Sequence, residues 1–480
     1  MTDPARLELS REEMRALGYR VVEAVVEHFE GLRETSPSGG GGRPALEALL
    51  REPPPEQGTD PAALVRFLCE QVFTRILKVD HPRFFAFVPS PSNFVGAMAD
   101  ALAAGFNGFV GSWFSGAAMA QLELVTVDWL RQLCGLPESA GGLFVSGGSM
   151  ANLTCLAVAR QVRLGERMSG AVVYFSDQTH SSVERALRVL GFASDQLRRL
   201  PSDDAFRLDL EGLRRAGVAD RAAGRSPFCV VANAGTTNTG AVDPLADLAG
   251  LCREEDLWLH VDGAYGAAAA LVPEGRRLLE GLERADSLSL DPHKWLFQPF
   301  EIGCALVREE RWLTETFRIL PEYLRDVHRS EEEVNFCDRG VQLTRNFRAL
   351  KLWMSLKTFG LTAFREAITR GMRLAEVAER RLRECGCFEV VTPAQLGVVT
   401  FRYARPGLAE EQVEAINQQL VGAMLADGYA VLTSTVLRGR TVLRLCTVNP
   451  RTTEEEIAET VRRLARLAEL AASRALSAGP

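Results

Sequence analysis

The sequence predicts an α/β protein with a mostly parallel central sheet, a smaller C-terminal α+β domain and an N-terminal helical arm. Between about residues 90 and 310, short apolar runs alternate with helix-like segments, which is typical of strands joined by crossover helices. The 480 residues are 46% hydrophobic and 24% charged, enough for one large α/β core with appendages. We expect an arm over residues 1–90, a large domain over 91–365 and a small domain over 366–480.

The arm begins with a predicted amphipathic helix over residues 10–34. Ser10 and Glu13 form a capping-box pattern, and an apolar stripe follows at helical spacing, made by Met14, Leu17, Val21, Val25 and Leu32. The segment TSPSGGGGRP then breaks the helix. A single apolar stripe needs a surface to cover it, so we expect the arm to pack on a partner subunit.

Five apolar runs predict the strands of the large domain, at residues 171–177, 228–235, 257–264, 287–292 and 303–308. The last run follows the fourth so closely that an antiparallel pairing is open for it. Ligands of such sheets collect at the carboxyl ends of the strands.

The small domain contains a long polar helix pattern and then strand-like runs at 388–393, 396–403 and 441–448. A final helix is predicted to start near Thr453, with Glu456 completing a capping box.

Charge and composition exclude several classes of protein. A net charge of −7 gives no reason to expect nucleic acid or an anionic membrane as a partner. The acidic N-terminal stretch is unlike a signal peptide, and the longest apolar runs are far too short to cross a bilayer. The ten cysteines include no Cys-x-x-Cys pair, so we expect reduced thiols, no metal site and a cytoplasmic protein.

The run FVSGGSMANL predicts an anion site. Gly147 and Gly148 lead into a helix with Ser149 near its start, where free backbone N–H groups and a small hydroxyl suit a phosphate. Many Gly-Ser turns merely begin helices, so this motif is weak alone.

Two further polar residues follow predicted strands. Asp262 ends an almost wholly apolar run, and a carboxylate buried there needs a partner such as a protonated ring nitrogen. The simpler interpretation is that Asp262 caps the turn that follows. His180 also follows a strand and opens a helix, and by itself a capping or surface histidine is the commoner case.

Lysine is scarce in this chain, which has only Lys78, Lys294, Lys351 and Lys357 among its 55 basic residues. Lys294 nevertheless lies in the apolar context DPHKW, where burying an ammonium is costly unless it does chemistry. A lysine, a phosphate cradle and a carboxylate are the set that pyridoxal 5′-phosphate requires, with the amine forming a Schiff base.

Several motifs carry a resemblance to a known family. NAGTTNTGAVDPLADL, LWLHVDGAYG and DPHKWLFQPFEIGC resemble the pyridoxal-phosphate-dependent group II decarboxylases of aromatic amino acids and glutamate, and the likeness extends over nearly the whole chain. It implies fold type I and an obligate homodimer with active sites at the subunit interface. It implies decarboxylation of an L-amino acid to the amine and CO2, and the expected substrates are aromatic: tryptophan, phenylalanine, tyrosine or DOPA.

The resemblance also implies residue roles. Lys294 matches the Schiff-base lysine, Asp262 the partner of the pyridine nitrogen, and His180 the histidine stacked on the cofactor. The phosphate cradle matches Gly147, Gly148 and Ser149, and further cofactor-lining positions match Thr236, Ala264, Asp291 and His293. Animal members carry asparagine where this chain has Asp291, so its contact with a phosphate dianion is open.

One position departs from the family. Counting back from TRNFRALK places Phe336 where the family's mobile loop carries a tyrosine that supplies a proton, and a positioned acid contributes about 10²–10⁴-fold. Either His180 or a water molecule supplies the proton, or O2 reacts with the carbanion and the product is an aldehyde. The second outcome is implied by the resemblance to plant aldehyde synthases, which carry phenylalanine in place of the loop tyrosine. A shifted alignment would leave Tyr323 as the nearest phenol.

The substrate side is less determined by the sequence. Ser90 matches a substrate-contacting position, Phe87 and Trp113 belong to an aromatic cluster that could line a pocket, and Gly303 matches a position where glycine favours a bulky indole. An acidic substrate would need another cation, for which Arg444 is a candidate.

Two other classes remain open. Transamination or cysteine desulfuration would use the same fold, with Cys337 the loop candidate for a desulfurase. A non-catalytic protein that kept the fold is the third alternative, against which the retained Lys294, Asp262 and His180 argue.

Overall fold

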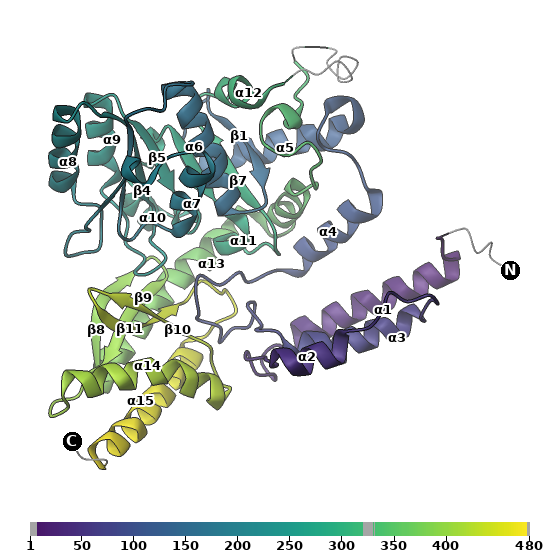
Figure 1. Cartoon of the computed structure of the whole chain (residues 1–480). Helices are drawn as coiled ribbons and strands as arrows, with labels where there is room; N and C mark the ends of the chain where they lie inside the picture. Colours follow the sequence, from purple (N-terminus) through teal and green to yellow (C-terminus); the bar gives the residue numbers. More distant parts are fainter. Residues whose placement is uncertain (1–6, 320–329, 331, 478–480) are drawn as a thin grey trace.

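The computed structural model describes residues 7–319, 330 and 332–477. It has an extended helical arm, a large α/β body and a C-terminal part built on a second sheet (Figure 1). The predicted fold class is confirmed.

The body is built on a seven-stranded sheet with the strand order β1-β7-β6-β5-β4-β2-β3. The strands are β1 (Gly141–Val145), β2 (Ala171–Ser176), β3 (Leu197–Leu200), β4 (Ser226–Asn233), β5 (Trp258–Asp262), β6 (Ser287–Leu290) and β7 (Gly303–Val307). All pairings are parallel except those of β7, which runs antiparallel to both β1 and β6. The five predicted strands are present, whereas the short strands β1 and β3 were not predicted.

Helices cover the sheet and connect its strands. They are α4 (Phe94–Phe106), α5 (Trp113–Leu133), α6 (Gly148–Leu164), α7 (Ser181–Val189), α8 (Leu210–Ala222), α9 (Leu245–Glu254), α10 (Pro273–Leu278), α11 (Pro292–Trp295) and α12 (Arg311–Phe317). Helix α6 follows β1 directly and packs across β5, β6 and β7. This packing points the N-terminus of α6 at the carboxyl ends of the central strands.

Helix α13 (Ala349–Cys385) joins the body to the C-terminal part. It contacts α4 and α5 on one side and β8 on the other, so the predicted boundary at residue 365 falls inside a helix that both parts share. The second sheet has the order β10-β11-β9-β8 and is antiparallel throughout. Its elements are β8 (Phe388–Gln395), β9 (Val398–Tyr403), α14 (Glu410–Asp427), β10 (Thr433–Leu437), β11 (Arg440–Cys446) and α15 (Glu454–Ser477).

The predicted caps at both ends of the chain are confirmed. In the arm, α1 (Arg11–Glu30) carries the Ser10–Glu13 capping box, and α2 (Arg43–Leu50) and α3 (Pro61–Phe67) lie beside it (Figure 1). Thr453 and Glu456 make the reciprocal bonds that start α15. Within the described ranges, no helix is both long and apolar enough to cross a membrane.

Candidate active site

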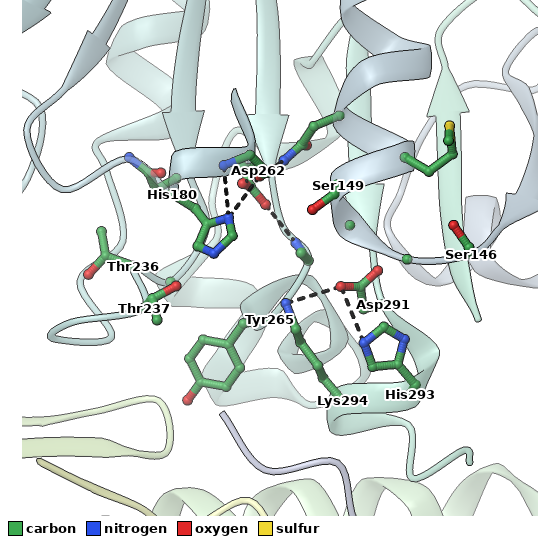
Figure 2. A pocket seen from close by; sticks show the side chains of 18 residues that line it. Ser146, Ser149, His180, Thr236, Thr237, Asp262, Tyr265, Asp291, His293 and Lys294 are labelled. Atoms are coloured by element: carbon green, nitrogen blue, oxygen red, sulfur yellow. Dashed lines mark hydrogen bonds and ion pairs between the residues drawn. The ribbon is translucent and has the colours of Figure 1, made fainter. Parts of the chain in front are cut away.

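A cavity of about 400 Å³ lies at the carboxyl ends of the central strands. Its walls come from the segments that follow β1, β2, β4, β5 and β6, so residues far apart in the chain converge on it (Figure 2). The cavity is lined by all ten predicted cofactor-binding residues: Gly147, Gly148, Ser149, His180, Thr236, Asp262, Ala264, Asp291, His293 and Lys294.

The glycine pair at the start of α6 leaves room for an anion. A Cβ added to Gly148 would lie 2.7 Å from Asp291 Oδ2, and one added to Gly147 would lie 3.2 Å from His293 Cε1. No side chain caps the N-terminus of α6, so its backbone N–H groups face the cavity. A side chain here would fill the space that a phosphate group needs.

Lys294 lies in the short helix α11 with its ammonium turned to Asp291. Its Nζ lies 3.0 Å from Asp291 Oδ2, while Asp291 Oδ1 is buried and makes no hydrogen bond with the described residues. Buried polar atoms are normally paired. This oxygen therefore marks a point where a bound group would be accommodated.

Asp262 ends β5 and receives three hydrogen bonds. Asn152 Nδ2 donates to Oδ2 over 2.9 Å, and the Ala264 N–H and the Ser289 hydroxyl each donate to Oδ1 over 3.1 Å. Burial alone would raise the pKa of Asp262, but the Lys294 charge, together with smaller contributions that include the Asn152 hydrogen bond, outweighs burial and lowers it. The carboxylate is therefore ionised and suited to a cationic ring nitrogen.

His180 both caps a helix and lines the cavity, so the capping interpretation is confirmed and stacking on a cofactor stays a prediction. Its Nδ1 accepts a hydrogen bond from the Ser182 N–H over 3.2 Å at the start of α7. Burial lowers the pKa of His180, which leaves the ring neutral with its proton on Nε2.

The sequence did not single out several residues of the cavity. Tyr265 stacks on Trp295 with ring centroids 5.2 Å apart, and its hydroxyl accepts a hydrogen bond from the Gly397 N–H. Asn152 lies one helical turn beyond Ser149, a spacing that would have placed it on the cavity face of α6. The other unpredicted lining residues are Ser146, Met150, Ser182, Asn233, Gly235 and Thr237.

The predicted substrate residues do not line this cavity. Phe87 is 58% exposed, Ser90 is buried, and Trp113 packs against the core beneath α6. Gly303 lies behind the cradle, where an added Cβ would come within 2.5 Å of Gly147 Cα. Close packing therefore explains the glycine at 303 without a substrate contact.

Phe336 is fully buried in this chain and does not line the cavity. It lies in a 3₁₀ turn, Phe336–Asp338, with the Arg345 guanidinium 4.8 Å from its ring centroid. Tyr323, the alternative phenol, is outside the described residues. Phe336 is therefore not brought to the cavity.

Arg444, the candidate cation for an acidic substrate, is a buried residue that does not line the cavity. It is 3% exposed and donates hydrogen bonds to the backbone carbonyls of Thr237, Asn238 and Phe87. Burial lowers its pKa. Arg444 thus ties the segment containing Phe87 to the turn at Thr237, which lines the cavity.

The residues present fit pyridoxal 5′-phosphate. The glycine cradle would hold the phosphate, ionised Asp262 the ring nitrogen, and the Lys294 amine the carbonyl carbon. The described residues include no cluster of three or more histidine, cysteine or acidic side chains that could hold a metal ion.

Comparison with known proteins agrees with this geometry. The protein-family model described as the pyridoxal-dependent decarboxylase conserved domain matches residues 47–404 of this chain. The chain is 51% identical to an aromatic-L-amino-acid decarboxylase of Bacillus atrophaeus, over 96% of this chain and 97% of that protein. It is 32% identical to a phenylacetaldehyde synthase of Petunia hybrida, with 92% of each chain covered. The solved Catharanthus roseus tryptophan decarboxylase in complex with L-tryptophan superposes with a TM-score of 0.90 at 28% identity, covering 97% of this chain and 100% of that one.

Proposed function

Because the chain belongs to the pyridoxal-dependent decarboxylase family, we propose that it converts an aromatic L-amino acid to the amine and CO2. The 51% identity to an aromatic-L-amino-acid decarboxylase over nearly the full length of both chains carries this proposal. The convergence of Lys294, Asp262 and the glycine cradle on one cavity supports it.

Pyridoxal phosphate, when bound, supplies an electron-withdrawing ring that accepts the electron pair left when CO2 departs. Asp262 would favour a proton on the ring nitrogen, because its lowered pKa makes it a carboxylate that stabilises a cationic ring. Lys294 would hold the cofactor through Nζ until the amine of the substrate takes its place. The buried Asp291, 3.0 Å away, holds Nζ in place before attachment.

His180 is proposed to return the proton to the α-carbon. Since its Nδ1 accepts from the Ser182 N–H, the neutral ring carries a proton on Nε2 within the cavity. Phe336 has no proton to supply and is buried away from the cavity. This assignment gives the chain a proton donor without the tyrosine of related enzymes.

The second candidate product is the aldehyde, formed with consumption of O2. The resemblance of the Phe336 position to aldehyde synthases and the 32% identity to a phenylacetaldehyde synthase favour it. The higher identity to the decarboxylase favours the amine. Both reactions release CO2, so CO2 alone does not separate them.

The test is to incubate the protein and pyridoxal phosphate with phenylalanine, tyrosine, tryptophan, DOPA and glutamate, and to follow CO2, amine, aldehyde and peroxide together. Amine equal to CO2 without peroxide is expected for one or more aromatic substrates. Stoichiometric aldehyde and peroxide would favour the second candidate. Turnover of glutamate alone would overturn the aromatic assignment, and Lys294→Ala is the control for background reaction.

We also propose that the protein is a homodimer in which the arm packs on the second copy. Helix α1 buries none of its residues in its own chain, and Met14 and Tyr19 are 56% and 65% exposed. Such an apolar face is a typical subunit contact. Light scattering should give the mass of a dimer, and Met14→Glu with Val21→Glu should shift the protein toward the monomer.

We propose that the segment containing Phe87, together with the second copy of the chain, supplies the contacts to the substrate. Phe87 presents an exposed ring on backbone held by Arg444 and Thr433. An aromatic substrate would bury that ring. Phe87→Ala should therefore raise KM for aromatic substrates more than it lowers kcat.

A further inference from the structure

Behind Asp262, a chain of buried side chains extends away from the cavity. Strands β5 and β6 pair in parallel, with His260 opposite Ser287 and Asp262 opposite Ser289. Residues two apart on a strand face the same side, so His260 and Asp262 both face α6. Asn152 of α6 lies between them and contacts both.

The hydrogen bonds of Asn152 have only one consistent assignment. Its amide nitrogen donates to Asp262 Oδ2 and to Ser182 Oγ, each over 2.9 Å. Turning the amide over would place its carbonyl oxygen against the ionised carboxylate, two acceptors facing each other. Asn152 Oδ1 therefore faces His260 Nε2, 3.0 Å away.

The orientation of Asn152 determines the protonation of His260. A carbonyl oxygen only accepts, so His260 Nε2 must carry a hydrogen. Burial lowers the pKa of His260 to about 4, which makes the ring neutral and leaves Nδ1 as an acceptor. The Ser287 hydroxyl, 2.9 Å away, must then donate to Nδ1.

The far end of the chain is a group that can only donate. Trp258 Nε1 donates to Ser287 Oγ over 2.9 Å, and an indole nitrogen has no acceptor role. Every bond therefore points the same way, from Trp258 through Ser287, His260 and Asn152 to the Asp262 carboxylate. Aligned hydrogen bonds of this kind polarise one another and stabilise negative charge at the acceptor end.

Asn152 has a second branch toward the cavity. Ser182 Oγ accepts from Asn152 and lies 2.8 Å from His180 Nδ1. One amide thus joins the partner of the ring nitrogen to the histidine beside the cofactor (Figure 2 labels Asp262 and His180). His260 is fully buried, touches no cavity surface and acts only through Asn152.

We propose that His260 is a positioning residue, which fixes the amide of Asn152 and thereby holds Asp262 as the ionised partner of the cofactor ring nitrogen. The inference rests on the proposed function only in taking pyridoxal phosphate as the ligand. It requires no particular substrate. Without the N–H of His260, the carbonyl oxygen of Asn152 loses its donor. The amide is then held less firmly, and its hydrogen bond to Asp262 weakens.

The test compares two cofactors in binding to the apoprotein. Deazapyridoxal 5′-phosphate has a C–H group in place of the ring nitrogen, so it has no proton for Asp262 to hold. His260→Phe should weaken binding of pyridoxal phosphate roughly tenfold, as expected for loss of a hydrogen bond supporting a charged group. Binding of the deaza compound should change less than about twofold.

Two further variants make the result specific. His260→Gln, which can donate to Asn152 and accept from Ser287, should recover most of the affinity for pyridoxal phosphate. His81→Phe removes another fully buried histidine whose pKa is also lowered to about 4, and it should leave the affinity ratio of the two cofactors unchanged.

Equal losses for both cofactors, or no loss for either, would overturn the proposal, because a purely structural role of His260 cannot discriminate a ring nitrogen from a C–H group. If His260→Phe does not fold, His260→Leu, which also lacks the N–H donor, gives the same comparison. Failure of aromatic decarboxylation would leave this result unaffected, whereas a wild-type protein that binds neither compound would overturn the proposed function as well.

Discussion

A buried ion pair closes the open edge of the central sheet, and its removal should cost the protein measurable stability. Among the described strands, β1 is an edge strand that pairs with β7 alone. Glu123 Oε1 accepts from the Phe144 N–H over 2.9 Å, and Arg345 Nη2 donates to the Phe144 carbonyl over 2.6 Å. Arg345 also binds the Glu123 carboxylate through its two terminal nitrogens, Nη1 and Nη2. Both side chains are at most 1% exposed.

Arg345→Met leaves the Glu123 carboxylate buried without its cation, and breaking such a pair costs about 3–5 kcal/mol. With a urea m-value of about 3 kcal/mol/M, the unfolding midpoint should fall by about 1–2 M. Phe144 lies three residues before Gly147, so cofactor affinity should also fall. Urea unfolding followed by circular dichroism, with a titration of pyridoxal phosphate, measures both effects.

The controls separate the buried charge from the loss of side-chain volume. Glu123→Gln combined with Arg345→Met should regain a large part of the lost stability, because no uncompensated charge remains. Arg383→Met, which breaks a surface pair with Glu379, should change the free energy of unfolding by less than about 1 kcal/mol. A loss from Arg345→Met no larger than that of Arg383→Met would refute the reasoning.

Three further outcomes are expected. Gly148→Ala places a methyl group 2.7 Å from Asp291 Oδ2 and should weaken cofactor binding at least about tenfold without unfolding the protein. The control Gly217→Ala, whose methyl group would meet the flexible Arg221 side chain in α8, should bind the cofactor normally. Lys294→Ala should abolish the covalent adduct trapped by borohydride, and mass spectrometry that found the adduct elsewhere would refute its role. Burial lowers the pKa of His81 to about 4 from an ordinary 6.5, so the unfolded chain binds the proton more tightly and folding stability is lost as pH falls from 6.5 to 4. His81→Phe should flatten this pH dependence of stability in urea unfolding, and an unchanged dependence would contradict the argument.

Much of the site could be predicted from the sequence because parallel strands collect their carboxyl ends at one edge. Once residues 171–177, 257–264 and 287–292 are read as strands, the residues after them must converge. His180, Asp262 and Lys294 are therefore neighbours in space, although up to 114 positions separate them in the chain. The glycine pair before α6 adds an anion site by the same local logic.

The predictions that the structure changed concern packing between distant segments. Phe336 lies in the core under Arg345, and nothing in the local pattern distinguishes a buried aromatic turn from an exposed loop. Gly303 is explained by the close approach of Gly147 from another strand. Arg444 is buried among carbonyls, whereas an isolated arginine in a sequence is usually solvated.

The sequence by itself determined the fold class, five strands of the central sheet, the caps that start α1 and α15 and the family, and it predicted ten of the residues that line the cavity. These depend on short-range periodicity and on motifs within a few residues. Only the tertiary structure decided which donor faces which acceptor: Asn152 between His260 and Asp262, and Arg345 on Glu123. Such pairings join elements over a hundred residues apart, so they are set by how helices pack on the sheet and have no signature in the local sequence.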